Sequence, residues 1–182
     1  KTTRRQDVID GMIRQVKTDE VLPFADHQVS EGAVVFAVDY DLGKIGHAYY
    51  DKESGNYWVS TGNRPDWNRG RQYRNDGVDI EFCSDSITNG YSVGWIEEGE
   101  WMQYTVYSPG EASVDINIRA ASRDAGGAVQ LSINNADELK VQLPKTGDDR
   151  RWQTTSAGRT KLRAGLNHVR VKALSGGFNL NY

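Results

Sequence analysis

The stretch "ASVDINIRAAS", residues 112–122, decides the fold class of this sequence. Apolar and polar side chains alternate along it, in the order Val114, Asp115, Ile116, Asn117, Ile118 and Arg119. Successive side chains of a β-strand point to opposite faces of the sheet. The alternation therefore predicts a strand with one buried face and one face in water.

Similar short stretches lie on both sides of it, separated by turns rich in Gly, Pro, Asn and Asp. They are "AVVFAVDY" (33–40), "GVDIEFCS" (77–84), "YSVGWIEEGEWMQYTVYS" (91–108), "GAVQLSINN" (127–135), "LKVQLP" (139–144), "RWQTTSAGRTKL" (151–162), "NHVRVKAL" (167–174) and "GFNLNY" (177–182). The first is a continuous apolar run, which is typical of a buried strand, and "IEEGEW" predicts a hairpin turn at Glu98-Gly99. Eight or nine short strands at this spacing predict an all-β protein with a jelly-roll-like β-sandwich.

The N-terminal part of the chain has a different pattern. In "RQDVIDGMIRQVK" (5–17) the apolar side chains recur at helical spacing. The following residues, up to about residue 32, show no periodicity. We expect residues 1–32 to be a short helix and linker that forms a tail from a neighbouring domain, and residues 33–182 to be the β-sandwich.

Composition excludes several classes of partner. The 182 residues carry a net charge of -3, so overall charge gives no reason to expect a nucleic-acid partner. No apolar run approaches the roughly 20 residues that span a bilayer, so we expect no membrane segment. The single cysteine, Cys83, rules out an internal disulfide and is expected to be a half-buried strand residue. We expect a monomer.

Catalytic chemistry finds little support in the sequence. His27, His47 and His168 are far apart and lack metal-ligand spacing. The acidic cluster in "IEEGE" (96–100) is local, whereas glycoside hydrolysis needs two carboxylates that face each other across a sugar. We therefore expect no enzyme activity from this chain. A glycosidase that uses Glu98 or Glu100 remains an alternative.

The stretch "SGNYWVSTGNRPDWNRGRQYR" (54–74) combines turn formers with large aromatic rings and arginines. Its rings could pack down to hold a long loop, or they could form a platform for a sugar. A pyranose ring presents C–H groups that stack on an aromatic face, while polar side chains bond its hydroxyls. The forked donors of arginine also suit carboxylate or sulfate groups.

Five motifs occur in an order and at distances that resemble the family 6 carbohydrate-binding modules. They are "YRNDGVDIE" (73–81), "GYSVGWIEEGEWMQYTV" (90–106), "INIRAAS" (116–122), "VQLPKTGDDRRWQTT" (141–155) and "FNLN" (178–181). A diverged first motif, "AVDYDLGKIGHAYYD" (37–51), precedes them. Members of this family are non-catalytic β-sandwich domains attached to secreted polysaccharide hydrolases.

The resemblance implies a set of sugar-binding residues at the loop end of the sandwich. Tyr73 corresponds to one wall of the family's sugar slot, and an Asn of the closing motif, Asn179 first and Asn181 second, to its hydrogen-bonding amide. The opposite wall is usually a Trp, but Asp149 stands there in this chain. We expect Trp67, or Trp58, from the inserted loop to replace the missing ring.

The resemblance also bears on metal and ligand. Many members hold a structural calcium through oxygen ligands in the first strand, where this chain has Phe36 and Val38. A hard cation needs oxygen donors, so no cofactor is expected and structural calcium is doubtful. The ligand implied is a plant or algal cell-wall polysaccharide. Arg74 and the other loop arginines leave open an anionic galactan, sulfated or carboxylated, beside a neutral glycan.

The expected function is to tether a secreted glycoside hydrolase to its polysaccharide, with the catalytic domain of the same parent chain as a partner. The site would be extracellular. The alternative is a structural docking domain of the parent hydrolase, with the aromatic loop buried in the interface between them.

Overall fold

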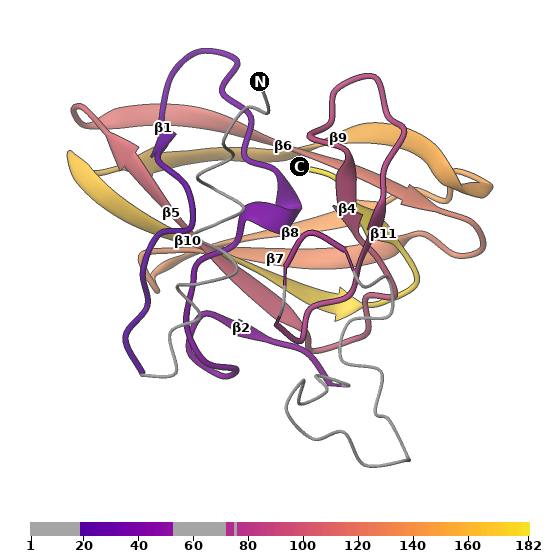
Figure 1. The fold of residues 1–182 in the computed structure, drawn as a ribbon. Helices are drawn as coiled ribbons and strands as arrows, with labels where there is room; N and C mark the ends of the chain where they lie inside the picture. The colour runs from indigo at the N-terminus through magenta and orange to yellow at the C-terminus, as the bar shows by residue number, and fades with distance from the viewer. Residues whose placement is uncertain (1–18, 53–71, 75) are drawn as a thin grey trace, which may run out of the picture.

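The computed structural model describes residues 19–52, 72–74 and 76–182, and in these ranges the chain is a β-sandwich (Figure 1). The all-β prediction is confirmed. The helix expected over residues 5–17 lies outside the described residues, as do Trp58 and Trp67. Among the described residues, no helix is long and apolar enough to cross a membrane.

Two sheets form the layers of the sandwich in the part of the chain that the structure describes. The six-stranded sheet has the order β1 (His27–Gln28), β5 (Trp101–Ser108), β10 (Gly165–Ser175), β7 (Gly127–Ile133) and β8 (Asp137–Leu143), with β2 (Tyr49–Tyr50) also paired to β5. The five-stranded sheet has the order β3 (Ile80–Phe82), β4 (Tyr91–Val93), β11 (Asn179–Leu180), β6 (Ala112–Ser122) and β9 (Asp148–Leu162). Neighbouring strands are antiparallel except β1 and β5.

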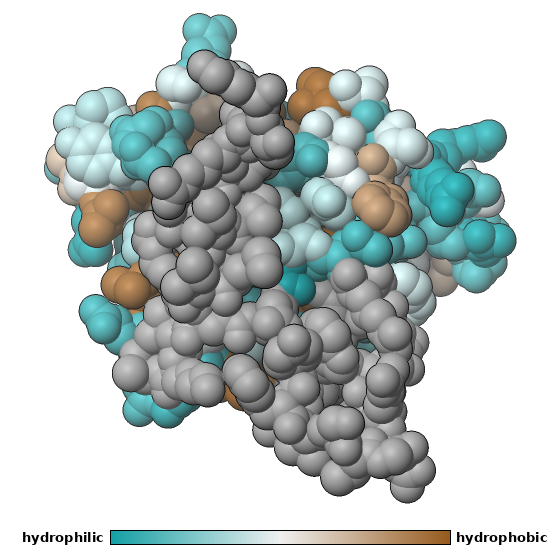
Figure 2. Space-filling view, viewed as in Figure 1, coloured by the Kyte–Doolittle hydropathy of each residue, from teal (hydrophilic) through white to brown (hydrophobic). Residues whose placement is uncertain are grey.

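The core lies between the two sheets. The inward side chains of β6 follow the predicted alternation, with Ile118 buried and Asp115 exposed. Val129 and Leu131 of β7 face them from the other sheet, and Leu180 of β11 lies beside them in the same apolar cluster. Burial of this apolar surface is the main stabilising contribution to a sandwich. Where grey atoms do not cover it, the surface is mostly hydrophilic, with separate hydrophobic patches (Figure 2).

The prediction of a strand over residues 33–40 is wrong. This segment contains a short 3-10 helix, Ala37–Asp39, which lies against the core. Val38 and Tyr40 are fully buried, and the Tyr104 hydroxyl donates to the Ala37 carbonyl oxygen over 2.8 Å. Residues 37–40 are therefore buried, but around a helical turn and not in a strand, and the run begins with exposed residues, Ala33 and Val34.

Two other segments differ in detail from expectation. The turn at Glu98-Gly99 is present, and Gly99 has a φ of 91°. It does not close a hairpin, because β4 and β5 belong to different sheets. Within residues 19–32, Leu22 bridges to Leu42 and β1 pairs with β5, so this part of the expected linker contributes to the sheet edge.

Candidate functional site

A polar cleft of about 450 Å³, called here the Asn179 cleft, lies at one end of the five-stranded sheet. Its lining residues come from five separate segments of the chain: Glu81, Trp95, Arg123, Asp124, Asp148, Asp149, Arg150, Gly177 and Asn179. β3 supplies Glu81, the segment after β4 supplies Trp95, and the start of β9 supplies Asp148 and Asp149. The cleft thus gathers residues that are far apart in sequence.

The amide of Asn179 has a fixed orientation in the cleft. Its Nδ2 donates to Glu81 Oε1 over 2.6 Å and to the backbone oxygen of Asp149 over 3.2 Å. Both partners accept hydrogen bonds, so the amide nitrogen must face them. The described residues donate no hydrogen bond to Asn179 Oδ1, which leaves this oxygen as an acceptor for a ligand hydroxyl.

Gly94 and Trp95 shape the cleft beside this amide. A Cβ atom at Gly94 would lie 3.1 Å from Glu81 Oε1 and 3.2 Å from Asn179 Oδ1, so only glycine leaves these groups undisturbed. Trp95 follows with a φ of 50°, in the left-handed region that few bulky residues adopt. Its side chain remains 44% exposed. A large ring is thereby presented to solvent beside polar hydrogen-bonding groups.

The charges of the cleft sum to a negative value. Its lining holds four carboxylates and two guanidinium groups, which gives 2 − 4 = −2. Arg123 pairs with Asp149 over 2.7 Å. Burial raises the pKa of the Glu81 carboxyl, while Arg150 and the hydrogen bond from Asn179 oppose this effect. Burial has this effect because it disfavours the charged form of a carboxyl.

The structure brings together two of the residues expected at the site. Asn179 and Asp149 both line the cleft. Asn181 is fully buried, and its Nδ2 donates to Asp85 Oδ2 and to the Ile87 carbonyl oxygen, so it holds the loop before β4. The binding roles expected of Asn179 and Asp149 stay predictions.

Tyr73 and Arg74 are not among the residues that line the cleft. The Tyr73 ring packs between Phe24 and Tyr91, with ring centroids 5.9 Å and 4.8 Å away, and its hydroxyl donates to Asp39. The Arg74 side chain is 1% exposed and pairs with Asp76 over 2.9 Å.

The guanidinium carbon of Arg74 also lies 3.6 Å from the centroid of the Tyr40 ring. In this structure Arg74 belongs to the interior and Tyr73 to an aromatic row that ends at exposed Phe82.

Trp95 and Glu81 line the cleft but were not predicted as site residues. Both occur inside motifs that carried the family resemblance, "GYSVGW" and "GVDIE". The unusual backbone conformation of Trp95 and the pairing of Glu81 with Asn179 appear only in the folded chain. Trp58 and Trp67, expected to replace the missing wall, lie outside the described residues.

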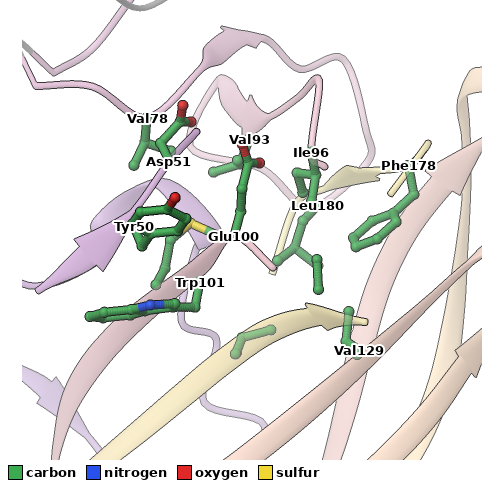
Figure 3. Close-up of a pocket in the computed structure, with 13 residues that line it drawn as sticks. Tyr50, Asp51, Val78, Val93, Ile96, Glu100, Trp101, Val129, Phe178 and Leu180 are labelled. Atoms are coloured by element: carbon green, nitrogen blue, oxygen red, sulfur yellow. The ribbon is translucent and has the colours of Figure 1, made fainter. Parts of the chain in front are cut away.

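Two other cavities are less suited to a sugar. The one in Figure 3 is a gap of about 20 Å³ in the core between Val93, Val129 and Phe178, with room for about one water molecule. The second, of about 490 Å³, opens between the sheets and is lined mostly by apolar side chains such as Ile116 and Val169. Of the three, the Asn179 cleft offers the most polar groups beside an exposed ring.

The residues at the family's calcium position do not fit a metal. Val38 lies in the core, and Phe36 packs against Tyr182. The nearby carboxylate of Asp41 accepts hydrogen bonds from the backbone nitrogen and the hydroxyl of Thr105, so donors already surround it. Within the described residues, no group of three His, Cys, Asp or Glu side chains could hold a metal ion.

Comparison with known proteins gives the family. Residues 74–182, which include the whole five-stranded sheet, match the family model described as "Carbohydrate binding module (family 35)". The C-terminal family 6 module of LamC, a marine laminarinase from Zobellia galactanivorans, is 31% identical, with a TM-score of 0.51 over 57% of this chain and 83% of that chain. The chain belongs to the carbohydrate-binding modules of the related families 35 and 6. The matches do not separate the two families.

Two further solved family 6 modules and a clotting factor subunit are also similar to this chain. A family 6 module of lichenase 5A from Cellvibrio mixtus, solved in complex with cellotriose, is 32% identical, with a TM-score of 0.50 over 58% of this chain and 82% of that chain. A Clostridium stercorarium family 6 module in complex with cellobiose shares the fold over 86% of this chain and 93% of that chain, with 16% identity and a TM-score of 0.58. The clotting factor G alpha subunit of Tachypleus tridentatus is 28% identical over 108 residues, which are 58% of this chain and 16% of that protein.

Proposed function

We propose that this module binds a neutral glycan of the β-glucan class in the Asn179 cleft, without catalysis. The observation that carries the proposal is the position of Trp95, whose 44% exposed ring stands beside the fixed amide of Asn179. An exposed aromatic face beside oriented polar groups is the combination that a pyranose requires, because its C–H face is apolar and its rim carries hydroxyls.

In this proposal each group has a definite role. The Trp95 ring stacks on the C–H face of one sugar. Asn179 Oδ1 accepts a hydrogen bond from a hydroxyl of that sugar, and Glu81 holds the amide in place. Because only a few contacts form, we expect weak affinity, on the order of micromolar to millimolar.

The charge of the cleft favours a neutral ligand over an anionic one. A net charge of −2 among the lining side chains repels sulfate and carboxylate groups. Arg123, the exposed guanidinium beside Asp149, is already paired with it. The similar modules named above come from a laminarinase and a lichenase, and one was solved with cellotriose, which supports a glucose-based chain.

We further propose that the module tethers a secreted glycoside hydrolase to its polysaccharide, as a monomeric domain outside the cell. The similarity to modules of two such hydrolases supports this role. The catalytic domain of the same parent chain would be its covalent partner.

The test is isothermal titration of laminarin, barley β-glucan and cellotriose into the parent module and the variant Trp95→Ala. Tyr107→Ala is the matched control, because Tyr107 is 40% exposed but lies on the six-stranded sheet. We expect Trp95→Ala to weaken binding about tenfold or more, or roughly 1.4 kcal/mol, and Tyr107→Ala to leave it unchanged. Equal affinity of both variants and the parent would refute the cleft as the site.

The same titration tests the inserted loop. If the ring of Trp67 or of Trp58 covers the sugar, replacing that residue by Ala should weaken binding. If both leave the affinity intact while Trp95→Ala does not, the hypothesis of a replacement ring from the insert fails and Trp95 alone supplies the stacking face.

A further inference from the structure

The two guanidinium groups that line the Asn179 cleft each interact with a carboxylate. Arg123 forms an ion pair with Asp149, with 2.7 Å between nitrogen and oxygen. Burial raises the pKa of the Glu81 carboxyl, and the positive charge of Arg150 opposes this rise, so these two groups attract each other. Each positive charge of the cleft is therefore balanced by one negative charge.

Two further carboxylates of the cleft, those of Asp124 and Asp148, are exposed, and within the described residues neither forms an ion pair. Asp148 Oδ1 accepts a hydrogen bond from the backbone nitrogen of Arg150 over 2.8 Å. The hydrogen bond to Asp149 raises the pKa of Arg123, and the charges of Asp148 and Asp124 add to this rise. The net charge of −2 among the lining residues therefore resides on Asp124 and Asp148.

Hydrogen bonds between buried groups fasten together the two segments that carry these carboxylates. Asp124 follows β6, and Asp148 begins β9. The backbone nitrogen of Ser122 donates to Thr146 Oγ1 over 2.9 Å, and the backbone nitrogen of Thr146 donates to the Ser122 carbonyl oxygen over 2.8 Å. Ser122 Oγ also accepts from the backbone nitrogen of Gly126 over 3.0 Å, which closes the loop around Asp124. The two carboxylates are thus held on the same side of the cleft.

The uncompensated charge lies in the cleft that also holds the exposed Trp95 ring and the amide of Asn179. Asn179 is 8% exposed, and the described residues donate no hydrogen bond to its Oδ1. A ligand that satisfies all three features needs an apolar face, a hydroxyl and a positive charge. An amino sugar combines them, because its ring has a C–H face, its rim has hydroxyls and its amine is protonated in mild acid.

We infer that the Asn179 cleft takes a cationic relative of the proposed glycan, a β-1,4-linked glucosamine chain, and binds it more tightly than the neutral chain. Ammonium groups of the sugar contact Asp124 and Asp148, while one ring of the chain stacks on Trp95. The inference rests on the proposed glycan site and narrows its substrate class. Such a chain has the backbone of cellotriose, the ligand of one similar module, with an ammonium group in place of the C2 hydroxyl.

The arrangement of the carboxylates favours a chain with repeated ammonium groups over a metal ion. Within the described residues, no group of three His, Cys, Asp or Glu side chains could hold a metal ion. An ammonium group needs no such convergence, because its three N–H donors bond separate acceptors. A neutral chain leaves both Asp124 and Asp148 without a positive partner, and an anionic chain is repelled by them.

The test is isothermal titration with three hexasaccharides that share a β-1,4-linked backbone and differ only at C2. The glucosamine hexamer carries ammonium groups, the N-acetylglucosamine hexamer neutral amides, and cellohexaose hydroxyls. At about pH 5.5, where the amines are protonated, we expect the parent to bind the glucosamine hexamer about fivefold more tightly than cellohexaose. The N-acetylated hexamer should show no such gain, and high salt should reduce the preference because it screens exposed charges.

The double variant Asp124→Asn with Asp148→Asn should remove the preference and leave the affinity for cellohexaose unchanged, because the amides keep the size of the side chains and lose the charge. The matched control is Glu31→Gln with Glu111→Gln, which also changes the net charge from -3 to -1 at two exposed positions. Glu111 precedes β6 and lies roughly 33 Å from the cleft, at about 3.3 Å per strand residue. β1 pairs with the end of β5, so Glu31, just after β1, lies at that far end as well. The control should keep the preference.

Three outcomes would overturn the inference. The glucosamine hexamer could bind no more tightly than cellohexaose. The control double variant could lose the preference as fully as the Asp124 and Asp148 double variant does. A lysine hexapeptide could displace the glucosamine hexamer as effectively as free glucosamine hexamer does, which would make the cleft a general cation surface.

Trp95→Ala separates this inference from the proposed function. It should weaken binding of both the glucosamine hexamer and cellohexaose, because both stack on the same ring. If Trp95→Ala leaves cellohexaose binding intact, the proposed site fails. If Trp95→Ala weakens cellohexaose binding but the parent shows no preference for the ammonium groups, the proposed site stands and only the inference fails.

Discussion

Asn179 donates a hydrogen bond of 2.6 Å to Glu81, a residue 98 positions earlier in the chain. This contact joins β11 to β3 across one end of the five-stranded sheet and sets which amide atom faces the cleft. A carboxylate acceptor makes the bond stronger than one between neutral groups. The binding geometry of the cleft therefore depends on a pair of side chains and not on Asn179 alone.

Asn179→Asp should disrupt the cleft more than its small change in size suggests. The new carboxylate would face Glu81 without a proton to donate, so two negative charges would be adjacent. We expect glycan affinity to fall about tenfold or more, or roughly 1.4 kcal/mol, measured by titration with laminarin. Asn135→Asp, the same change at an exposed turn, should leave affinity unchanged. Equal loss in both variants would point to net charge as the cause.

Glu81→Gln should raise stability at neutral pH. Burial raises the pKa of the Glu81 carboxyl above its ordinary value of 4.5, so the folded state binds its proton more tightly than the unfolded state does. The contribution of this proton to stability is fully present below the unfolded pKa and is lost as pH rises through the folded pKa.

Glutamine keeps the oxygen that accepts from Asn179 and carries no charge at any pH. The free energy of unfolding of Glu81→Gln, relative to the parent, should therefore increase as pH rises above about 4.5. Denaturant titrations of both proteins between pH 4 and pH 7, at intervals of about one pH unit, measure this difference in the free energy of unfolding. A relative stability that falls with pH would show that Glu81 gains more from Arg150 than it loses by burial.

Gly94→Ala should weaken binding by displacing the pair. The added Cβ would lie 3.1 Å from Glu81 Oε1 and 3.2 Å from Asn179 Oδ1. Asn179 must then move, and a loss of about 1 kcal/mol in glycan binding, roughly fivefold, is expected for one misplaced hydrogen bond. Gly110→Ala is the matched control, because a Cβ there meets no atom within 4 Å. Unchanged affinity of Gly94→Ala would mean that Asn179 Oδ1 does not contact the sugar.

Periodicity predicted some elements closely and could not predict others. β6 has the bounds 112–122 that its alternation predicts. The apolar run at residues 33–40 has no such period, and a buried helical turn and a buried strand are equally apolar. Its conformation depends on distant partners, such as the Tyr104 hydroxyl bonded to Ala37. Contacts of this kind cannot be read from the local sequence.

The site was predictable in part for a similar reason. The family motifs predicted Asn179 and Asp149, which the structure brings to one cleft. Trp95, which lines the same cleft, was not predicted, because its left-handed backbone conformation is one that sequence gives little reason to expect for a tryptophan. Tyr73 was expected in the slot, yet it packs against Phe24 and Tyr91. The position of the Tyr73 ring could not be predicted because a long insert precedes this residue in the sequence.

Removal of divalent metal should leave the fold unchanged. Phe36 and Val38 supply no oxygen ligand, and the Asp41 carboxylate already accepts hydrogen bonds from Thr105. We expect the same Tm with and without an excess of EDTA, measured by calorimetry. A large drop in Tm would reveal a calcium site built from other residues.

Asp85→Ala should destabilise the protein more than removal of an exposed ion pair. Asp85 accepts two hydrogen bonds from Arg119, of 2.7 Å and 2.8 Å, and a third from Asn181 Nδ2. Its side chain is 5% exposed, so its loss removes a buried acceptor from two N–H groups of the Arg119 guanidinium and from one N–H of the buried Asn181 amide. We expect the free energy of unfolding to fall by about 2–3 kcal/mol.

Asp115→Ala is the matched control, because Asp115 pairs with Arg159 in water and should contribute far less. The hydrogen bonds from Arg119 lower the pKa of Asp85, so its stabilising effect is present above the unfolded pKa and is lost as pH falls through the folded pKa. The difference between Asp85→Ala and the parent should therefore shrink in acid. If it stays constant down to pH 2, the destabilisation comes from lost packing and not from the charge of Asp85.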